Sequence, residues 1–293
     1  MKKIAILGPR GTYCDIAATK YLENNNLELE KEYYPSIIKS IHSVNSNTVC
    51  MAPIENALDG VVTEALDEII KSNLNIKCQL KLPIDFAFVS NNSDITKIKY
   101  VYVQFKAYGQ CLDFINQYDF EIIKTESNIL SLNKLQNSSL EYGAIIPIHK
   151  AYNDFKLKIL NVADTRNNET RFFLLDNNKP NFDIETNFEA SLVFTSIKDK
   201  PGVFYNILKE FYLKNINLKL ILSRPSKSIG KYNFYIEINA KIEEKDSFIE
   251  LINEFMKSKD YKIKLLGIYN DLGEWYYESS INYNKKKRWF WIK

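Results

Sequence analysis

Side chains that can bind anions or donate hydrogen bonds gather in three short segments of the sequence. These segments are residues 8–12, 53–60 and 167–172. In the first, Gly8 and Gly11 let a ligand approach the backbone, and the predicted helix that follows offers unpaired N–H groups to a carboxylate. Thr12 is also a good helix N-cap, and that alternative stays open.

The other two segments also combine polar groups with predicted strand ends. Asn56 can both donate and accept hydrogen bonds, which suits a small ligand with hydroxyl and carboxylate groups. Glu55 or Asp59 is either a general acid or base or, more simply, a helix cap. In residues 170–172 a hydroxyl, a guanidinium and an aromatic ring stand together, and the alternative is a polar loop that enters an ordinary sheet.

The elements that carry these segments alternate between strand and helix. Residues 3–7 form a short apolar run, and residues 12–15 have the Thr-x-x-Asp pattern of a capping box. Further strands are predicted at 48–54, 80–89, 98–105, 120–124, 142–148 and 171–175, and helices at 37–44, 62–70, 107–117 and 128–137. This alternation predicts mostly parallel sheets covered by helices, which bind ligands at the carboxyl ends of strands.

A turn-rich polar stretch at 176–189 predicts a domain linker. Beyond it the order becomes βαββαβ, with strands at 191–197, 218–223, 232–240 and 262–269 and helices at 202–214 and 246–257. The third strand follows a predicted hairpin turn at 228–231. Its apolar residues Phe234, Ile236 and Ile238 alternate with Asn233, Tyr235, Glu237 and Asn239.

Length and composition bound the class of protein. A chain of 293 residues predicts about two domains, and a net charge of +3 gives no footprint for nucleic acid. The first apolar run is too short for a signal peptide, and no run reaches the roughly 20 apolar residues of a membrane span. The four cysteines lack a Cys-x-x-Cys pair, so we expect no disulfide framework or zinc site and a cytoplasmic location.

Several common chemistries lack the residues that they need. The two histidines, His42 and His149, exclude a His-rich metal cluster. Neither a Gly-x-Gly-x-x-Gly motif nor a P-loop motif occurs, which counts against dinucleotide and P-loop chemistry. The basic, aromatic stretch at 285–291 has the composition to contact a membrane surface or nucleic acid, but we expect an exposed or subunit-packing tail.

These segments together resemble the prephenate dehydratases over nearly the whole chain. The resemblance rests on residues 7–13, on Pro53 to Asn56 with Gly60, and on Thr170-Arg171-Phe172. Residues 200–204, 216–218 and 223–226 resemble the two ligand-gripping stretches of an ACT regulatory domain.

The resemblance implies a fold, an activity and partners. The implied fold is α/β: a two-lobed, periplasmic-binding-protein-like catalytic domain at 1–179, a βαββαβ (ferredoxin-like) ACT domain at 187–270 and a tail at 271–293. The implied activity is conversion of prephenate to phenylpyruvate with loss of water and carbon dioxide, without a cofactor. A homodimer or homotetramer joined through the ACT domains is implied, with L-phenylalanine as feedback inhibitor.

The resemblance also implies roles for individual residues. Thr170 is the catalytic hydroxyl, and Arg171 forks onto the retained pyruvyl carboxylate or orients its loop. The implied substrate-binding residues are Thr12, Asn56, Ala57, Arg171 and Phe172. The implied effector-binding residues are Gly202, Val203, Asn217, Leu218, Leu222, Ser223, Arg224 and Pro225.

The sequence departs from the family pattern at several places. Ala57 stands where a Ser is expected, and Leu222 stands where a Glu usually precedes Ser-Arg-Pro. Residues 82–86, 103–106 and 127–129 lack the family's His, Ser-His-Pro and Ser-Thr-Ala features. An arogenate dehydratase and a non-enzymatic sensor of aromatic metabolites therefore remain as alternatives.

Overall fold

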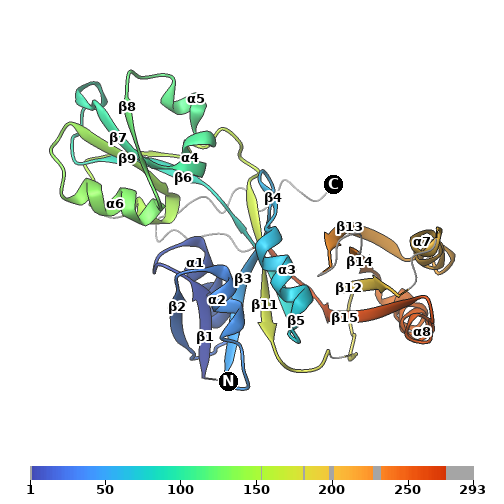
Figure 1. Cartoon of the computed structure of the whole chain (residues 1–293). Helices are drawn as coiled ribbons and strands as arrows, with labels where there is room; N and C mark the ends of the chain where they lie inside the picture. Colours follow the sequence, from blue (N-terminus) through green and yellow to red (C-terminus); the bar gives the residue numbers. More distant parts are fainter. Residues whose placement is uncertain (1, 153, 181, 198–200, 227–231, 275–293) are drawn as a thin grey trace. The chain divides into compact units, whose positions relative to one another are not determined.

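The computed structural model describes residues 2–152, 154–180, 182–197, 201–226 and 232–274. The chain divides into two compact units (Figure 1). The first unit comprises Met1–Arg10, Cys14–Lys81 and Arg171–Gly273, and the second comprises Gly11–Tyr13, Leu82–Thr170 and Glu274–Lys293. The chain crosses between the units inside two strands, because Lys81 and Leu82 share one strand and Thr170 and Arg171 share another.

The first unit contains a seven-stranded sheet with the order β16-β5-β11-β3-β1-β2, and β4 pairs with β3. Its strands are β1 (Lys3–Leu7), β2 (Glu30–Tyr34), β3 (Thr48–Asn56), β4 (Gly60–Val61), β5 (Asn75–Pro83), β11 (Glu169–Asp176) and β16 (Asp271–Glu274). The helices that belong with it are α1 (Tyr13–Asn24), α2 (Ile37–His42) and α3 (Thr63–Lys71). On α3, Leu66, Ile69 and Ile70 are buried at helical spacing, so one stripe of the helix joins the core.

The same unit contains a four-stranded antiparallel sheet, β13-β14-β12-β15. Its elements in chain order are β12 (Phe188–Ser196), α7 (Val203–Leu213), β13 (Asn217–Pro225), β14 (Tyr232–Ala240), the short η3 (Ile242–Glu244), α8 (Lys245–Met256) and β15 (Tyr261–Tyr269). The predicted βαββαβ order is therefore confirmed. Because the resemblance stated from the sequence implies a regulatory role for these elements, we use the names regulatory domain for them and regulatory sheet for their strands.

Both faces of the regulatory sheet pack against other elements, although alternate residues of the edge strand β13 are exposed. One face packs against α7 and α8 in an apolar cluster that includes Phe194, Phe211 and Phe248. On the other face Val193 and Tyr235 join the core of the seven-stranded sheet, and a Cβ added at Gly267 would lie 2.3 Å from the carbonyl oxygen of Ile76. The two sheets therefore share one core in the first unit.

The second unit contains a five-stranded sheet with the order β10-β6-β9-β7-β8. Its strands are β6 (Phe86–Ser90), β7 (Tyr100–Gln104), β8 (Glu121–Thr125), β9 (Tyr142–Pro147) and β10 (Leu157–Leu160). Its helices are η1 (Ile95–Lys97), α4 (Phe105–Gly109), α5 (Leu112–Ile115), α6 (Asn128–Gln136) and η2 (Ile148–Lys150). β7 pairs in parallel with β8 and β9, whereas β6 pairs antiparallel with β9 and β10.

Most predicted elements are present, and the α/β fold class is confirmed, but four expectations are wrong. The sheets are mixed rather than mostly parallel, because antiparallel strands lie beside the parallel ones. β2 and β10 were not predicted, and residues 80–89 form two strands, of which the first ends at Pro83, a residue that cannot donate to a ladder. The helix predicted at 107–117 is two short helices.

The break between α4 and α5 has a tertiary cause. The Asp164 carboxylate accepts hydrogen bonds from the backbone N–H groups of Leu112 and Asp113 at 2.9 and 3.0 Å. This distant acceptor satisfies the first N–H groups of α5, so a new helix begins there. The predicted turn at 228–231 and the tail after Glu274 lie outside the described residues, whereas the first four residues of the predicted tail form β16.

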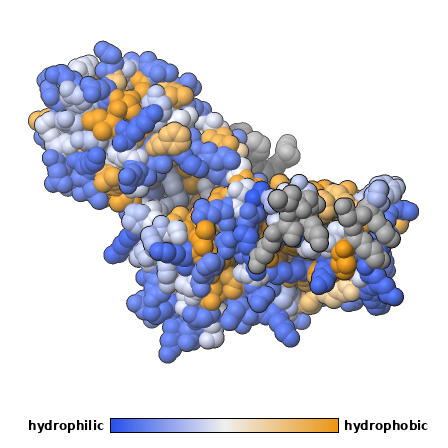
Figure 2. All heavy atoms as spheres, in the orientation of Figure 1, coloured by the Kyte–Doolittle hydropathy of each residue, from blue (hydrophilic) through white to orange (hydrophobic). Residues whose placement is uncertain are grey.

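In the view of Figure 2 the surface is mainly hydrophilic, with separate hydrophobic patches. Within the described ranges, no helix is long and apolar enough to cross a membrane. No group of three or more His, Cys, Asp or Glu side chains among these residues is placed to hold a metal ion.

Candidate active site

Thr170 lies near the start of β11, at the point where this strand passes from the second unit to the first. Side chains alternate along a strand, so Thr170 and Phe172 point to one face and Arg171 and Phe173 to the other. Phe172 is fully buried, and Phe173 belongs to the core that the two sheets of the first unit share. The predicted catalytic hydroxyl thus lies at the start of a firmly packed strand.

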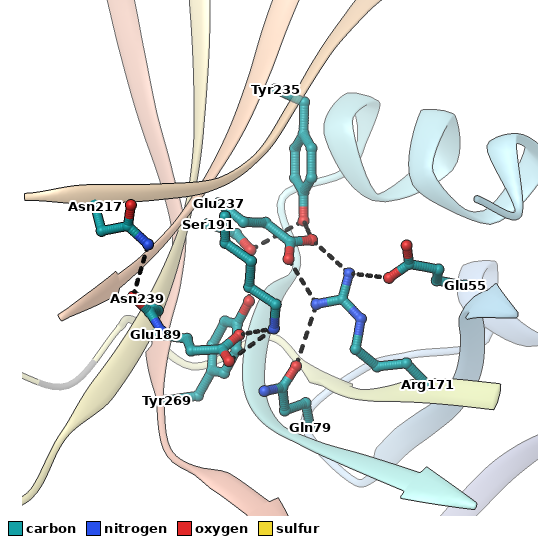
Figure 3. A network of polar contacts seen from close by, with 11 residues as sticks. Glu55, Gln79, Arg171, Glu189, Ser191, Asn217, Tyr235, Glu237, Asn239 and Tyr269 are labelled. Atoms are coloured by element: carbon teal, nitrogen blue, oxygen red, sulfur yellow. Dashed lines mark hydrogen bonds and ion pairs between the residues drawn. The ribbon is translucent and has the colours of Figure 1, made fainter. Parts of the chain in front are cut away.

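Arg171 is only 5% exposed and is surrounded by acceptors (Figure 3). Its Nη1 and Nη2 donate to the two carboxylate oxygens of Glu237 at 2.6 and 2.9 Å, a bidentate ion pair. Nη1 also donates to Oε1 of Gln79 at 3.2 Å, and Nη2 lies 2.9 Å from Oε2 of Glu55. Both terminal nitrogens are therefore engaged, and the predicted contact with a substrate carboxylate stays a prediction.

Glu237 belongs to β14 of the regulatory sheet and is fully buried. It also accepts a hydrogen bond from the Tyr235 hydroxyl at 2.6 Å, and Ser191 joins the hydroxyls of Tyr235 and Tyr269 at 3.0 and 2.7 Å. Burial is the largest single influence on the pKa of Arg171 and lowers it, but the charge and hydrogen bonding of Glu237, together with Tyr269 and Tyr235, outweigh it, so the net shift is upward. Burial and Glu237 together raise the pKa values of Tyr235 and Tyr269.

The second segment forms the turn between β3 and β4. Oδ1 of Asn56 accepts hydrogen bonds from the backbone N–H groups of Leu58 and Asp59, both at 3.0 Å, so Asn56 shapes its own turn. Ala57 is exposed in this turn, and Glu55 pairs with Arg171. The first unit therefore brings together the Glu55-Asn56 segment and Arg171.

The first segment contributes Gly11, Thr12 and Tyr13 to the second unit. Gly11 has a φ of +89°, which favours glycine, and a Cβ there would lie 2.8 Å from Nζ of Lys150. Nε2 of His149 donates to the carbonyl oxygen of Gly11 at 3.2 Å. A histidine and a lysine thus lie beside the backbone at which an anion was expected.

Two further polar contacts of the second unit lie near the predicted site residues. The Tyr13 hydroxyl donates to the carbonyl oxygen of Asp85 at 2.6 Å, and burial raises the pKa of the Asp85 carboxyl. Nδ2 of Asn168, a residue that is 1% exposed, donates to Oε1 of Gln110 at 3.0 Å. This contact holds the chain that leads into Thr170.

The predicted effector residues fall at both ends of the regulatory sheet. Asn217 pairs with Asn239, and Pro225 pairs with Tyr232, so β13 runs the whole length of the sheet. Gly202 has a φ of +85° and is the N-cap of α7, which follows the end of β12. Because Phe188 of β12 faces Ala240, Asn217 lies at the end of the sheet where β12 begins.

Two predicted effector residues contact the seven-stranded part of the first unit. Arg224 donates from Nε and Nη2 to the Asp67 carboxylate on α3 at 2.7 and 2.8 Å. Leu222 is partly buried against the shared core. Nearby, Lys264 of β15 donates to the backbone oxygens of Ile70 (3.1 Å) and Ser72 at the end of α3, and burial lowers its pKa.

Sequence reasoning missed five polar residues around these segments: Asp85, Gln110, His149, Lys150 and Glu237. His149 carried a signal, since it is one of two histidines in the chain. Lys150 and Gln110 carried none, because isolated polar residues are usually solvated. Glu237 carried a misleading one, because its place on the polar side of an alternating strand is typical of exposure to water.

Comparisons with known proteins bear directly on these segments. The family model described as prephenate dehydratase matches residues 4–180. A prephenate dehydratase of Methanocaldococcus jannaschii is 33% identical over 265 residues, which cover 89% of this chain and 95% of the relative. The crystal structure of a prephenate dehydratase from Staphylococcus aureus has a TM-score of 0.73 at 28% identity and covers 92% of this chain and 100% of its own.

A prephenate dehydratase from Arthrobacter aurescens, solved in complex with L-Phe, has a TM-score of 0.75 at 21% identity, with 91% of this chain and 89% of that chain covered. At this identity the likeness shows the fold alone. The fold is thus that of a mixed α/β, periplasmic-binding-protein-like protein with a C-terminal βαββαβ domain. The chain belongs to the prephenate dehydratase family, which confirms the resemblance stated from the sequence.

Proposed function

We propose that this chain is a prephenate dehydratase, which converts prephenate to phenylpyruvate, water and carbon dioxide. The observation that carries the proposal is the Thr170-Arg171-Phe172 segment, set at the start of a buried strand in a chain whose residues 4–180 match the family model. A hydroxyl at a strand end suits a reaction that needs hydrogen-bond donors rather than a redox group.

The chemistry explains why such side chains suffice. The bond between the ring and its carboxylate breaks, and its electron pair moves into the ring. The bond from the ring to the hydroxyl group breaks, and the hydroxyl takes up a proton that comes in the end from solvent and leaves as water. We assign Thr170 the donation of a hydrogen bond to this departing oxygen.

Other residues of the three segments would hold the substrate. Thr12 and Asn56 would donate or accept hydrogen bonds, and Ala57 and Phe172 would contribute apolar surface. Lys150, whose Nζ lies against Gly11, is our candidate for a cation that binds a substrate carboxylate. For Arg171 we favour the orienting role, because Glu237 and Glu55 already engage its terminal nitrogens.

One assay tests this function. Purified protein is given prephenate, and phenylpyruvate is measured against Thr170→Ala and Thr170→Ser, with circular dichroism as a check on folding. Thr170→Ala is expected to lower kcat by about 100- to 1,000-fold, as for loss of one transition-state donor, and Thr170→Ser to keep most of it. No phenylpyruvate from the wild type would contradict the proposal, and phenylalanine formed from arogenate instead would reassign the substrate.

We also propose that the βαββαβ domain is an ACT domain at 187–270. L-Phenylalanine would bind to it and regulate the enzyme. The predicted effector residues at the two ends of the sheet would meet across two copies of the chain. β13 is an edge strand, and antiparallel pairing of two such edges would set Asn217 of one copy beside Pro225 of the other. Exposed apolar residues near this edge, Tyr205, Tyr212 and Ile221, support a homodimer or homotetramer.

Two measurements test the regulatory part. L-Phenylalanine is expected to raise the melting temperature through mass action, because at 100 times its Kd a ligand adds about 2.7 kcal/mol to the free energy of unfolding. D-Phenylalanine is expected to raise the melting temperature less. Ile221→Lys is expected to shift the mass from light scattering toward the monomer. If L-phenylalanine leaves the melting temperature unchanged, the effector site does not lie in this domain.

We also propose a cytoplasmic location, which the four free thiols support.

A further inference from the structure

A fully buried carboxylate of the regulatory domain is bonded to the residue that follows the proposed catalytic threonine. Glu237 lies on β14, and Arg171 lies on β11, directly after Thr170. The two side chains form the bidentate pair at 2.6 and 2.9 Å that Figure 3 shows. This pair joins the regulatory sheet to the strand that carries Thr170.

The charges around Arg171 restrict the positions that its side chain can adopt. One guanidinium faces two carboxylates, Glu237 and Glu55, with Gln79 as a neutral acceptor. Among the described residues, Nε of Arg171 has no hydrogen-bond partner. A buried charge that loses its partner is strongly disfavoured, so Arg171 has few alternative positions while Glu237 stays in place.

Glu237 is itself held from behind. The Tyr235 hydroxyl donates to it, and Ser191 links Tyr235 to Tyr269 on a neighbouring strand. These three residues are at most 3% exposed, so packing as well as hydrogen bonding fixes the carboxylate. The regulatory sheet therefore presents a preset acceptor to Arg171.

The anchored guanidinium acts on the two segments that the proposed reaction uses. Through its backbone Arg171 fixes the position of β11 next to Thr170, and through Nη2 it pairs with Glu55, which precedes Asn56. A displacement of about 1 Å at a reacting group can cost 100-fold in rate. Loss of Glu237 would free this anchor without touching the substrate.

We propose that Glu237 is a positioning residue for the dehydratase reaction: it orients Arg171 and thereby holds Thr170, so that the regulatory domain completes the catalytic strand. The inference rests on the proposed function. It assigns a catalytic consequence to a residue of the regulatory sheet that lies outside the matched residues 4–180.

The test compares Glu237→Gln with a matched control on the same sheet. Glu189 is also a buried acid (8% exposed), but it pairs with Lys219 at 2.6 Å inside the regulatory domain. Glu237→Gln is expected to lower kcat for phenylpyruvate formation by about 10- to 100-fold with KM within about threefold. Glu189→Gln is expected to leave kcat unchanged, and Glu237→Asp, which keeps the charge, to lie between Gln and wild type.

Amide hydrogen exchange supplies a readout that does not need activity. Exchange at residues 169–172 is expected to rise at least about tenfold in Glu237→Gln and to stay unchanged in Glu189→Gln. Unchanged exchange and kcat in Glu237→Gln would overturn the inference, as would an equal fall in both variants. If the wild type makes no phenylpyruvate, the proposed function fails, and exchange alone still decides the anchoring. If Glu237→Gln does not fold, Tyr235→Phe, which removes one donor to Glu237, should give the same changes at smaller size.

Discussion

The two faces of the regulatory sheet both contribute residues to buried cores, yet they differ in chemistry. The face beneath α7 and α8 is apolar and rich in aromatic rings: Phe194 packs edge-on against Phe255 with centroids 5.0 Å apart, and Phe188 lies 5.3 Å from Phe248. The face toward the seven-stranded sheet carries Ser191 and Glu237 among its buried residues.

This difference separates two tasks. Apolar packing is non-directional and mainly stabilises the fold, whereas a bidentate ion pair with supporting hydroxyls fixes orientation. A buried ion pair often adds little net stability relative to apolar residues of the same size. We therefore interpret the apolar face as the source of stability and the polar face as the means of setting β11.

The largest effect is expected on the apolar face. Phe248 is fully buried between α8 and β12, so Phe248→Ala removes a ring and leaves a cavity. The free energy of unfolding should fall by about 3–5 kcal/mol in urea denaturation. Met256→Ala on the same helix, at a side chain 57% exposed, is the control and should change it by less than about 0.5 kcal/mol. A small loss at Phe248 would contradict a tightly packed face.

A middle-sized effect is expected where the polar face approaches the other sheet. The Cβ of Gly267→Ala would lie 2.3 Å from the carbonyl oxygen of Ile76, so β15 and β5 must move apart. We expect a loss of about 1–3 kcal/mol by chemical denaturation. Gly109→Ala at the end of α4, where a Cβ meets nothing within 4 Å, should be neutral or slightly stabilising. Equal effects of the two changes would argue against close docking.

The smallest effect is expected in the pH dependence of stability, through Tyr269 on the polar face of the sheet. Burial and Glu237 raise the pKa of Tyr269, so its contribution is present below the unfolded tyrosine pKa of about 10 and is lost as pH rises through the folded pKa. Tyr269→Phe should cost about 1 kcal/mol at neutral pH, because Ser191 loses a partner, and should weaken the alkaline decline. Tyr212→Phe, at a side chain 81% exposed, should follow the wild type.

Much of the fold could be predicted from the sequence because local patterns decided it. The helical spacing on α3 and the alternation on β14 both gave elements at the right places. The predictions failed where a distant residue intervened, as when Asp164 provides the start of α5. The edge strand β2 is mostly charged, so its pattern resembled a loop, and the edge strand β10 is only four residues long.

The candidate site was predictable only in part. The segments around Thr12, Asn56 and Thr170 stood out by residue type, and their roles on substrate stay predictions. Glu237 could not be foreseen, because alternation tells which residues share a face and not what covers that face. The second sheet that buries Tyr235 and Glu237 comes from residues far away along the chain.

The most direct test compares one change on each face. Phenylpyruvate formation is measured for Glu237→Gln and Phe248→Leu at a temperature where circular dichroism shows both to be folded. Phe248→Leu should be less stable to urea than the wild type but should keep the wild-type kcat. Glu237→Gln should lose about 10-fold or more in kcat. Equal kcat in the two variants would contradict the claim that the polar face sets the catalytic strand.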